Sequence, residues 1–334
     1  IFMSTQSKEQ QQIGFLSLCY HYIRPDNDDP FSRLMGTKIT EFKNQIKMLK
    51  EKFEMISLDD VLEFINTKIF ENNKHKMLLT FDDGLSEHYN AAKILKQFDI
   101  KATFFIPTCI LKERLPANPM IIHYVIAKYG IEKFLEEFRY ALKKLGLEIK
   151  KYDITYVRED DDVWKKIAEI KYNFKYKLGY KISREILLHI YQNSLLIEYP
   201  NILEIIHLNK EQIHEMLEMG HRIGVHTHTH ISVAATSLSD SDFFNEIVFP
   251  KKYLEDEFNV PIKSFSYPFG ERKDYLSSMR FLNKTKEYDL AFTVEEIVNF
   301  GNTPLEIGRY QPMSHDNVRT LENNLSNIIK KNIL

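Results

Sequence analysis

Two short segments combine residue types that bind a divalent metal ion. The first, Lys76–Gly84, is an apolar run that ends in Asp82, Asp83 and Gly84. Adjacent carboxylates at the end of a buried strand raise each other's pKa, and a dication removes that cost. Gly84 permits the positive φ that a sharp strand-to-helix turn often needs. Taken alone, the segment fits either an acidic ligand pair or an Asp-Gly turn with a capping Asp.

The second segment, Gly220–His230, holds a cluster of histidines. His226 and His230 are four residues apart, so one helical or turn-like face presents both imidazoles to a single ion. His228, between them, should point away. Together with Asp83 the two histidines form a three-ligand set that suits zinc, cobalt or nickel and leaves positions open for water, as in catalytic sites. The alternative is a surface patch or a set of hydrogen-bonded core histidines, but a strand-like run directly before the cluster favours the metal site.

The elements that must position these segments indicate an α/β fold. Short apolar runs alternate with amphipathic stretches, which favours a parallel sheet covered by helices. Strands are expected at Gly14–His21, Phe53–Ser57, Met77–Asp82, Ala102–Pro107, Arg222–His226, Ser264–Tyr267 and Leu290–Val294. Amphipathic helices are expected at Thr40–Phe53, Leu58–Lys68, Glu87–Phe98, Lys210–Met219, Asp240–Phe258 and Leu321–Ile333. Both acidic and histidine segments then follow the ends of strands.

This alternation stops in residues 108–207, which are rich in Lys, Glu, Tyr and Ile. The segment is too long for a loop, and helices are expected at Pro119–Leu145, Asp162–Leu178 and Ser183–Leu196. The insertion begins at the carboxyl end of a strand, which is the ligand side of a parallel α/β fold, so it could cover a site there. It serves either as a lid or as a structural or oligomerisation element.

The composition is that of a globular protein without an electrostatic footprint for nucleic acid. The chain has 334 residues, 43% of them hydrophobic, and a formal net charge of −2. The apolar fraction argues against global disorder, and a nucleic-acid partner would require a basic face. Cys19 and Cys109 each lie in an apolar run and are expected as reduced, buried thiols.

The beginning of the chain shows no export signal. Residues 1–12 are polar and rich in Gln, without the basic and apolar regions of a signal peptide. No apolar stretch approaches the roughly 20 residues that cross a bilayer, so no transmembrane segment is expected. We therefore expect a flexible N-terminus and a cytoplasmic protein.

In combination, the segments resemble the polysaccharide deacetylases with a NodB-homology domain, carbohydrate esterase family 4. The resemblance covers roughly residues 14–110 and 208–310 and leaves out the helical insertion. Its matching segments are Thr80–Gly84 for the first motif, His226–His230 for the second, Ser264–Gly270 for the third, the strand Ile100–Pro107 and the opening Leu18–His21. The motifs are specific together, because their order and spacing also agree.

The resemblance implies a distorted (β/α)7-type barrel built from residues 13–107 and 208–320. In such a barrel Asp83, His226 and His230 would bind one divalent ion, zinc or else cobalt, nickel or manganese. Asp82 would be the general base. The third motif would place Tyr267 and Phe269 at the substrate, with a backbone N–H near Phe269 as an oxyanion donor.

Two features depart from the family pattern. The third motif often begins with an Arg that pairs with the catalytic Asp, and here that position is Ser266. Arg309, on the strand-like run Leu305–Tyr310, is the candidate replacement, although a surface ion pair would explain it equally well. The usual segment that supplies a general acid is missing, and the choice between His21 and His315 stays open.

These features predict a metal-dependent hydrolase that removes an N-acyl group, acetyl or formyl, from a sugar. The expected partner is an acylated sugar or glycan intermediate, soluble or linked to a nucleotide or lipid. One alternative is an imide or ureide hydrolase on the same scaffold. Another is a catalytically impaired, saccharide-binding relative, which the missing Arg and acid motifs would explain.

Overall fold

The computed structural model describes residues 13–70, 72, 74–152, 154, 163–231 and 238–333. The N-terminus expected to be flexible, residues 1–12, lies outside the described residues. Among the helices that are described, none has both the length and the apolar character needed to pass through a membrane.

A sheet of seven parallel strands forms the centre of the described molecule. Its order is β1-β5-β6-β7-β8-β9, and β4 pairs with the first half of β5. The strands are β1 (Phe15–Tyr20), β4 (Glu54–Ile56), β5 (Lys76–Phe81), β6 (Thr103–Ile106), β7 (Arg222–Val225), β8 (Ser264–Ser266) and β9 (Leu290–Phe292). Each falls within a predicted strand except β5, which begins one residue before the predicted start at Met77. Apolar runs bounded by polar residues are strong signals for a buried strand.

Residues 305–310 close the curled sheet between its two outer strands. Ile307 forms a parallel bridge with Phe292 of β9, and Tyr310 forms one with Leu18 of β1. The N–H of Tyr310 donates to the carbonyl of Ser17 at 2.9 Å, as in a regular parallel ladder. The expected distorted (β/α) barrel is therefore confirmed, and this strand-like run is the segment that closes it.

Alternate side chains of the strands face two different apolar clusters. In β5, Met77 and Leu79 belong to the larger cluster that packs under the outer helices. Leu78, between them, belongs to a smaller cluster with Phe15 and Phe105. Because strand residues alternate between faces, this smaller cluster fills the barrel, where residues of α2 also contact it.

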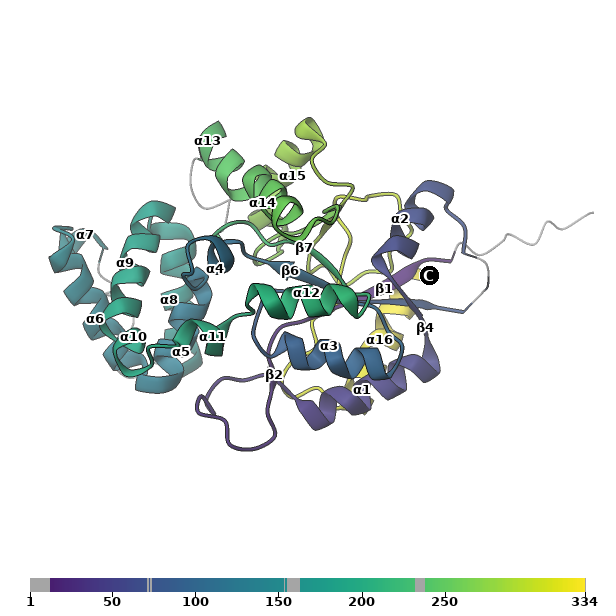
Figure 1. Cartoon of the computed structure of the whole chain (residues 1–334), viewed down its shortest axis with the longest axis horizontal. Helices are drawn as coiled ribbons and strands as arrows, with labels where there is room; N and C mark the ends of the chain where they lie inside the picture. The colour runs from purple at the N-terminus through teal and green to yellow at the C-terminus, as the bar shows by residue number, and fades with distance from the viewer. Residues whose placement is uncertain are drawn as a thin grey trace, which may run out of the picture.

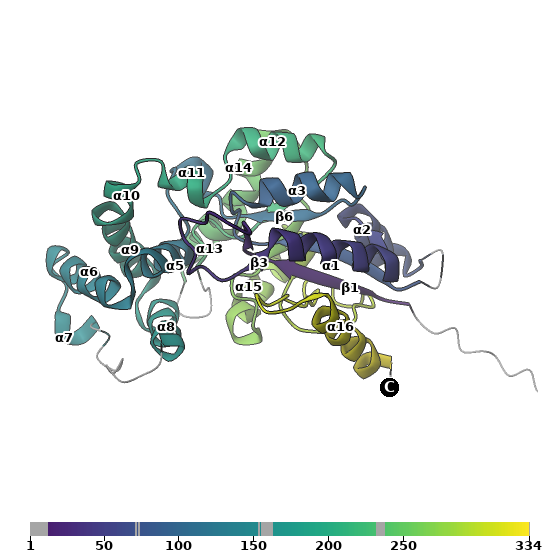
Figure 2. The ribbon, with the colours of Figure 1, turned by 90° about the horizontal axis from the view of Figure 1, so that it is seen from below.

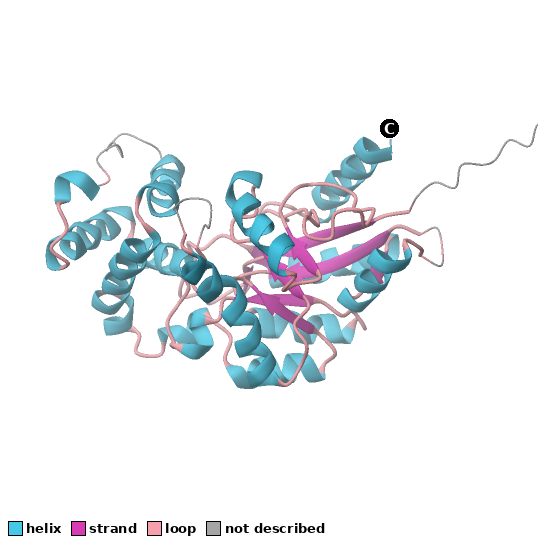
Figure 3. Cartoon of the chain, turned by 90° about the horizontal axis from the view of Figure 1, so that it is seen from above, coloured by secondary structure: helices cyan, strands magenta, loops and turns pink. Residues whose placement is uncertain are grey.

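Most helices surround the barrel on its outer face (Figure 3), whereas α2 packs against the cluster inside it. These helices are α1 (Ile39–Lys52), α2 (Leu58–Thr67), α3 (His88–Gln97), α12 (Lys210–Glu218), α13 (Asp240–Phe243), the π-helix η2 (Phe244–Val248), α14 (Phe249–Phe258), α15 (Arg272–Thr285) and α16 (Val318–Ile333). A small parallel pair, β2 (Ile23–Arg24) and β3 (Thr37–Lys38), extends from the end of β1. The predicted helix Asp240–Phe258 is thus interrupted by a π-helical turn.

The insertion is helical and lies at one end of the molecule, beside the barrel (Figures 1 and 2). Its helices α5, α6 and α9 pack on one another. The elements are α4 (Cys109–Lys112), α5 (Asn118–Tyr129), α6 (Ile131–Lys144), α7 (Ile149–Tyr152), α8 (Val163–Tyr172), the π-helix η1 (Asn173–Lys177), α9 (Tyr180–Asn193), α10 (Leu195–Glu198) and α11 (Ile202–Ile206).

The single helix predicted at Pro119–Leu145 is wrong. Gly130 adopts φ of 89°, which side chains rarely tolerate, and so separates α5 from α6. Similarly, the predicted helix Asp162–Leu178 is α8 followed by a π-helical turn, and its predicted start at Asp162 lies outside the described residues. Amphipathic periodicity runs through such breaks, so it does not reveal them.

Candidate active site

Asp82 lies at the open end of the barrel and points toward its axis. It continues the alternation of β5 in which Leu78 and Thr80 face the same side. The carboxylate is 2% exposed and accepts two hydrogen bonds from Arg309, at 2.9 Å to Oδ1 and 2.8 Å to Oδ2. The strand that leads into Asp82 therefore positions the carboxylate directly against the guanidinium of Arg309, in the segment that closes the barrel.

Arg309 is fully buried and its guanidinium is surrounded by acceptors. Besides the two bonds to Asp82, it donates to the carbonyl of Thr293 at 2.8 Å, to Thr80 Oγ1 at 3.0 Å and to Ser266 Oγ at 2.9 Å. The Ser266 hydroxyl in turn donates to Asp82 Oδ2 at 2.9 Å. Ser266 thus connects the pair at the position where the family motif often carries Arg. A buried charge is stable only when paired and hydrogen-bonded in this way.

This pairing keeps Asp82 ionised. Burial alone would raise the pKa of its carboxyl, but the charge of Arg309 and its hydrogen bonds outweigh that effect and hold the pKa well below the usual range. An ionised, oriented carboxylate is the state that a general base needs.

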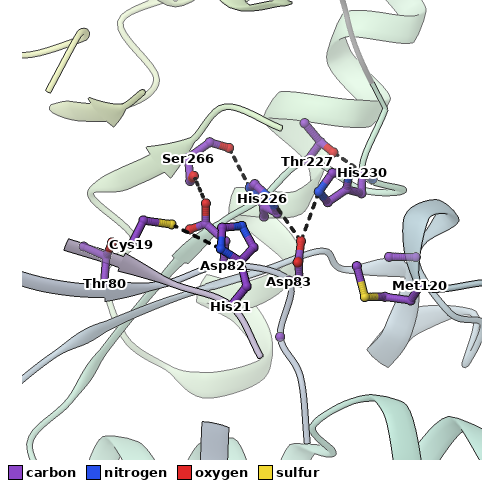
Figure 4. Close-up of polar contacts among 12 residues, drawn as sticks. Cys19, His21, Thr80, Asp82, Asp83, Met120, His226, Thr227, His230 and Ser266 are labelled. Atoms are coloured by element: carbon purple, nitrogen blue, oxygen red, sulfur yellow. Dashed lines mark hydrogen bonds and ion pairs between the residues drawn. The ribbon is translucent and has the colours of Figure 1, made fainter. Parts of the chain in front are cut away.

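Asp83, His226 and His230 converge beside this pair (Figure 4). Asp83 Oδ1 lies 3.0 Å from Nε2 of His230 and 3.4 Å from Nε2 of His226, and all three residues are buried. The structure therefore brings together the three residues that the spacing suggested as metal ligands.

The donor set fits a divalent cation. His226 Nδ1 lies 2.9 Å from the carbonyl oxygen of Ser266. Because a carbonyl only accepts, Nδ1 carries the proton, and Nε2 of a neutral His226 turns its lone pair toward the Asp83 carboxylate. Two buried acceptors facing each other are unfavourable unless a cation lies between them, and a carbonyl that orients the outer nitrogen is typical of metal-binding histidines. Burial lowers the pKa of His226, but the charges of Asp82 and Asp83 outweigh it and raise that pKa.

The loops that carry these ligands have strained backbones. Positive φ occurs at Asp83 (80°), Thr227 (59°), His230 (62°) and Phe269 (65°). Such conformations cost energy in residues other than glycine and cluster at functional sites. At Asp83 the turn is completed by Gly84, also at positive φ (57°), where an added Cβ would come within 3.0 Å of Ile110. The turn redirects Asp83 away from the barrel axis that Asp82 faces.

His228 points away from the cluster, as predicted. Its Nε2 lies 3.0 Å from Glu113 and its Nδ1 lies 2.8 Å from Thr108 Oγ1. Both partners belong to the beginning of the insertion, so His228 joins the insertion to the histidine loop.

The two candidate acids occupy different places. His21 is half-buried at the end of β1, near enough to Asp82 and Asp83 for its charge to lower the pKa of both carboxyls. His315 is exposed and lies at the wall of the same cavity. A second potential metal group, formed by His21, Cys19 and Asp82, is weaker because Asp82 is committed to Arg309 and burial raises the pKa of the Cys19 thiol.

The two residues predicted from the third motif differ in what they can offer. Tyr267 donates its hydroxyl to the carbonyl of Leu305 at 2.9 Å and its N–H to the carbonyl of Phe292 at 3.1 Å. Tyr267 therefore contributes its ring to the cavity wall, and its hydroxyl and N–H are both bonded to backbone carbonyls. Phe269 packs edge-on against His230, with ring centroids 5.0 Å apart, and also lines the cavity.

A cavity of about 1390 Å³ opens over the site. Its floor holds Asp82, Asp83, His226 and His230. The insertion supplies much of its wall with apolar and cationic side chains, among them Met120, Ile122, His123, Ile126, Lys171 and Lys175. Our sequence interpretation missed all of these wall residues, since a histidine or lysine on an otherwise apolar helix gives no sign of what it faces.

A parallel α/β barrel with an Asp–His–His cluster and an Asp–Arg pair at the carboxyl ends of its strands defines a hydrolase-type site. The model of the family described as "Polysaccharide deacetylase" matches residues 71–114 and 189–291, on both sides of most of the insertion. The predicted resemblance to the polysaccharide deacetylases is confirmed over these two segments of the chain.

Solved structures share the fold at low sequence identity. The Streptococcus pyogenes deacetylase PplD in complex with acetate has a TM-score of 0.56 and 17% identity, and the alignment covers 94% of this chain and 99% of that one. IcaB from Ammonifex degensii has a TM-score of 0.55 and 17% identity, with 94% and 98% covered. BC0361, a polysaccharide deacetylase from Bacillus cereus, has a TM-score of 0.54 and 15% identity, with 93% and 69% covered. A comparison with curated proteins found no match.

Proposed function

We propose that the protein is a metal-dependent hydrolase that removes an N-acyl group, acetyl or formyl, from a sugar or glycan intermediate. The observation that carries this proposal is the Asp83–His226–His230 cluster adjoining the buried Asp82–Arg309 pair. The match of two segments to the polysaccharide deacetylase family model supports the acylated saccharide as substrate. The cavity above the cluster supports a ligand larger than a single acyl group.

In this proposal Asp83, His226 and His230 hold the ion, with zinc as the first candidate and cobalt, nickel or manganese as alternatives. When bound, a divalent ion lowers the pKa of water and polarises the scissile carbonyl. Asp82 accepts a proton from the attacking water, and Arg309 fixes both carboxylate oxygens so that no reorientation is needed.

The reaction balances as an ordinary amide hydrolysis. The water oxygen forms a bond to the acyl carbon, the carbon–nitrogen bond breaks, and the products are a carboxylate and a free amino sugar. The departing nitrogen needs a proton, and His21 at the cavity floor and His315 at its wall are the two imidazoles placed to provide it. A backbone N–H near Phe269 remains our candidate for a second oxyanion donor.

The test is the Asp82→Asn variant of the zinc-loaded protein, assayed for acetate release from an N-acetylglucosamine oligosaccharide. Asn keeps the shape but cannot accept a proton as a base, so the turnover should fall by about 10²–10⁴-fold. Asp289→Asn, which changes an exposed aspartate that pairs with the exposed Lys263, is the matched control and should retain full activity. Equal turnover in the wild type and the Asp82 variant on every acylated saccharide would refute the proposal.

A further inference from the structure

Helix α5 of the insertion is hydrogen-bonded to both loops that carry the proposed metal ligands. His207 Nδ1 lies 3.2 Å from the carbonyl of Gly84, directly after Asp83, and its Nε2 accepts the N–H of Ala117 at 3.2 Å. The N–H of Asn118, where α5 begins, donates to the carbonyl of Thr229 in the histidine loop at 3.4 Å. The position of α5 is therefore fixed relative to the metal-binding cluster by two independent connections.

From this helix, Met120 and His123 extend into the cavity. They are three residues apart and so lie on the same helical face. Figure 4 shows Met120 beside Asp83. Both side chains line the cavity together with Asp83 and His230. A histidine of the insertion is thus present in the same cavity as the proposed reaction centre.

One nitrogen of His123 is anchored, and the other has no partner. Its Nδ1 lies 3.0 Å from the hydroxyl of Tyr22, which also lines the cavity just after β1. Its Nε2 is buried and, within the described chain, forms no hydrogen bond. A buried polar atom without a partner is unfavourable, so such an atom in a cavity is a sign of a ligand contact.

The surroundings select one form of this imidazole. Burial raises the pKa of the Tyr22 hydroxyl, which therefore stays protonated and can donate. Its two neighbours are Met120 Sδ, also at 3.0 Å, and His123 Nδ1, and the imidazole nitrogen is much the stronger acceptor. Burial and the nearby Lys171 cation hold the pKa of His123 well below its usual value. His123 is then neutral, with its proton on Nε2.

We propose that His123 of the insertion, anchored by Tyr22, is a substrate-contacting residue whose Nε2–H donates a hydrogen bond to an oxygen of the acylated sugar. This inference rests on the proposed function and names a contact that lies outside the barrel motifs. The insertion then takes part in substrate recognition directly, in addition to forming a wall of the cavity.

Two measurements test the inference. The first is the ¹⁵N spectrum of the metal-free protein, in which His123 should show the neutral form with Nε2 protonated; Tyr22→Phe should shift it toward the Nδ1-protonated form. The second is the dissociation constant of an N-acetylglucosamine tetrasaccharide. This dissociation constant should rise about 3–10-fold in His123→Leu, because leucine fills the position with an apolar side chain but has no hydrogen-bond donor. His189→Leu, in α9 of the same insertion but outside the cavity lining, should leave it unchanged.

The outcomes separate this inference from the proposed function. A wild type that binds the tetrasaccharide through His123 without hydrolysing it supports the contact and refutes the function. A wild type that hydrolyses it, with the same dissociation constant in a folded His123→Leu variant, refutes the contact alone. An Nδ1-protonated His123 in the wild type also overturns the inference, because Nε2 would then have no proton to donate.

Discussion

Asp82 at the barrel rim and His123 of the insertion line the same cavity, but they differ in how completely their polar atoms are hydrogen-bonded. At the rim, each charged oxygen of Asp82 is bonded by Arg309, and that guanidinium also bonds Thr80, Ser266 and a backbone carbonyl. On the insertion, His123 leaves its buried Nε2 without a partner in the described chain. The Asp82–Arg309 pair is organised before the substrate arrives, whereas His123 of the insertion keeps a donor for it.

This difference separates the chemistry from the recognition. A base held by two hydrogen bonds needs no reorganisation during the reaction, which is how preorganised sites lower barriers. A donor satisfied only by the substrate discriminates against ligands that lack the matching oxygen, because the donor is otherwise left buried and unpaired. Substitutions of rim residues should therefore reduce turnover and the free energy of unfolding, whereas substitution of His123 in the cavity wall should reduce the affinity for substrate.

The largest effect should come from removing the metal ligand set. Asp83→Ala leaves two histidines, too few for the proposed site, and turnover should fall to the background rate. In the wild type, a metal at 100 times its dissociation constant should stabilise the fold by about 2.7 kcal/mol, and a chelator should reverse this. Thermal unfolding with zinc and with chelator measures both. An unfolding temperature of Asp83→Ala that still responds to zinc would place the ion elsewhere.

The second effect concerns the buried pair. Arg309→Met leaves Asp82 buried without its cation, which should cost about 3–5 kcal/mol of unfolding free energy at neutral pH. The exposed pair of Arg222 and Asp59 is the control, and Arg222→Met should cost less than about 1 kcal/mol. Urea unfolding of the three proteins measures the difference.

Arg309→Met should also change how the protonation of Asp82, and with it the activity, depends on pH. In the wild type the pKa of Asp82 is depressed, so its contribution to stability is present above the unfolded-state pKa and is lost as the pH falls toward the folded-state value. Without Arg309, burial dominates and the pKa of Asp82 rises above its ordinary value. The acidic limb of the activity profile should then move to higher pH. A profile unchanged by the substitution would show that Arg309 does not set the charge of Asp82.

The placement of Asp82 and Asp83 follows from patterns that the sequence displays. An apolar run of strand length put both at a strand end, and period-two alternation sends Asp82 inward with Thr80. Spacing also identified His226 and His230. The strand-like run at residues 305–310 made Arg309 a candidate partner of Asp82, but the sequence left a surface ion pair equally open. The structure shows that this run closes the barrel between β9 and β1 and that Arg309 is buried against Asp82.

His123 could not be predicted from the same patterns. Helix α5 has an apolar sequence with buried Ile121 and Val125, so a single histidine in it is typical of a core position. Its role depends on where the helix lies, and that position is set by His207, far along the chain from α5. Likewise, the sequence does not reveal that the hydroxyl and the N–H of Tyr267 are bonded to the carbonyls of Leu305 and Phe292.

A smaller effect should distinguish the two candidate acids. His21 lies beside Asp82 and Asp83 at the cavity floor, whereas His315 is exposed at the wall. We expect His21→Ala to lower turnover by about 10²-fold, in the range of a lost general acid. His315→Ala should change turnover by less than roughly 3-fold, because an exposed hydrogen bond contributes little. The reverse order would assign the acid to His315.

The smallest effect should come from His228, the third histidine of the cluster. It belongs to the same loop as the ligands, but Glu113 and Thr108 hold it toward the insertion. His228→Ala should therefore leave the zinc dissociation constant within about 2-fold of the wild type, whereas His230→Ala should weaken binding by far more. Because the lost contacts join the loop to the insertion, the substitution should instead cost roughly 1 kcal/mol of stability, a typical value for a hydrogen bond that is only partly buried. Isothermal titration with zinc and urea unfolding separate the two effects. A large loss of zinc affinity in His228→Ala would mean that the insertion, through this residue, positions the metal site as well as the substrate.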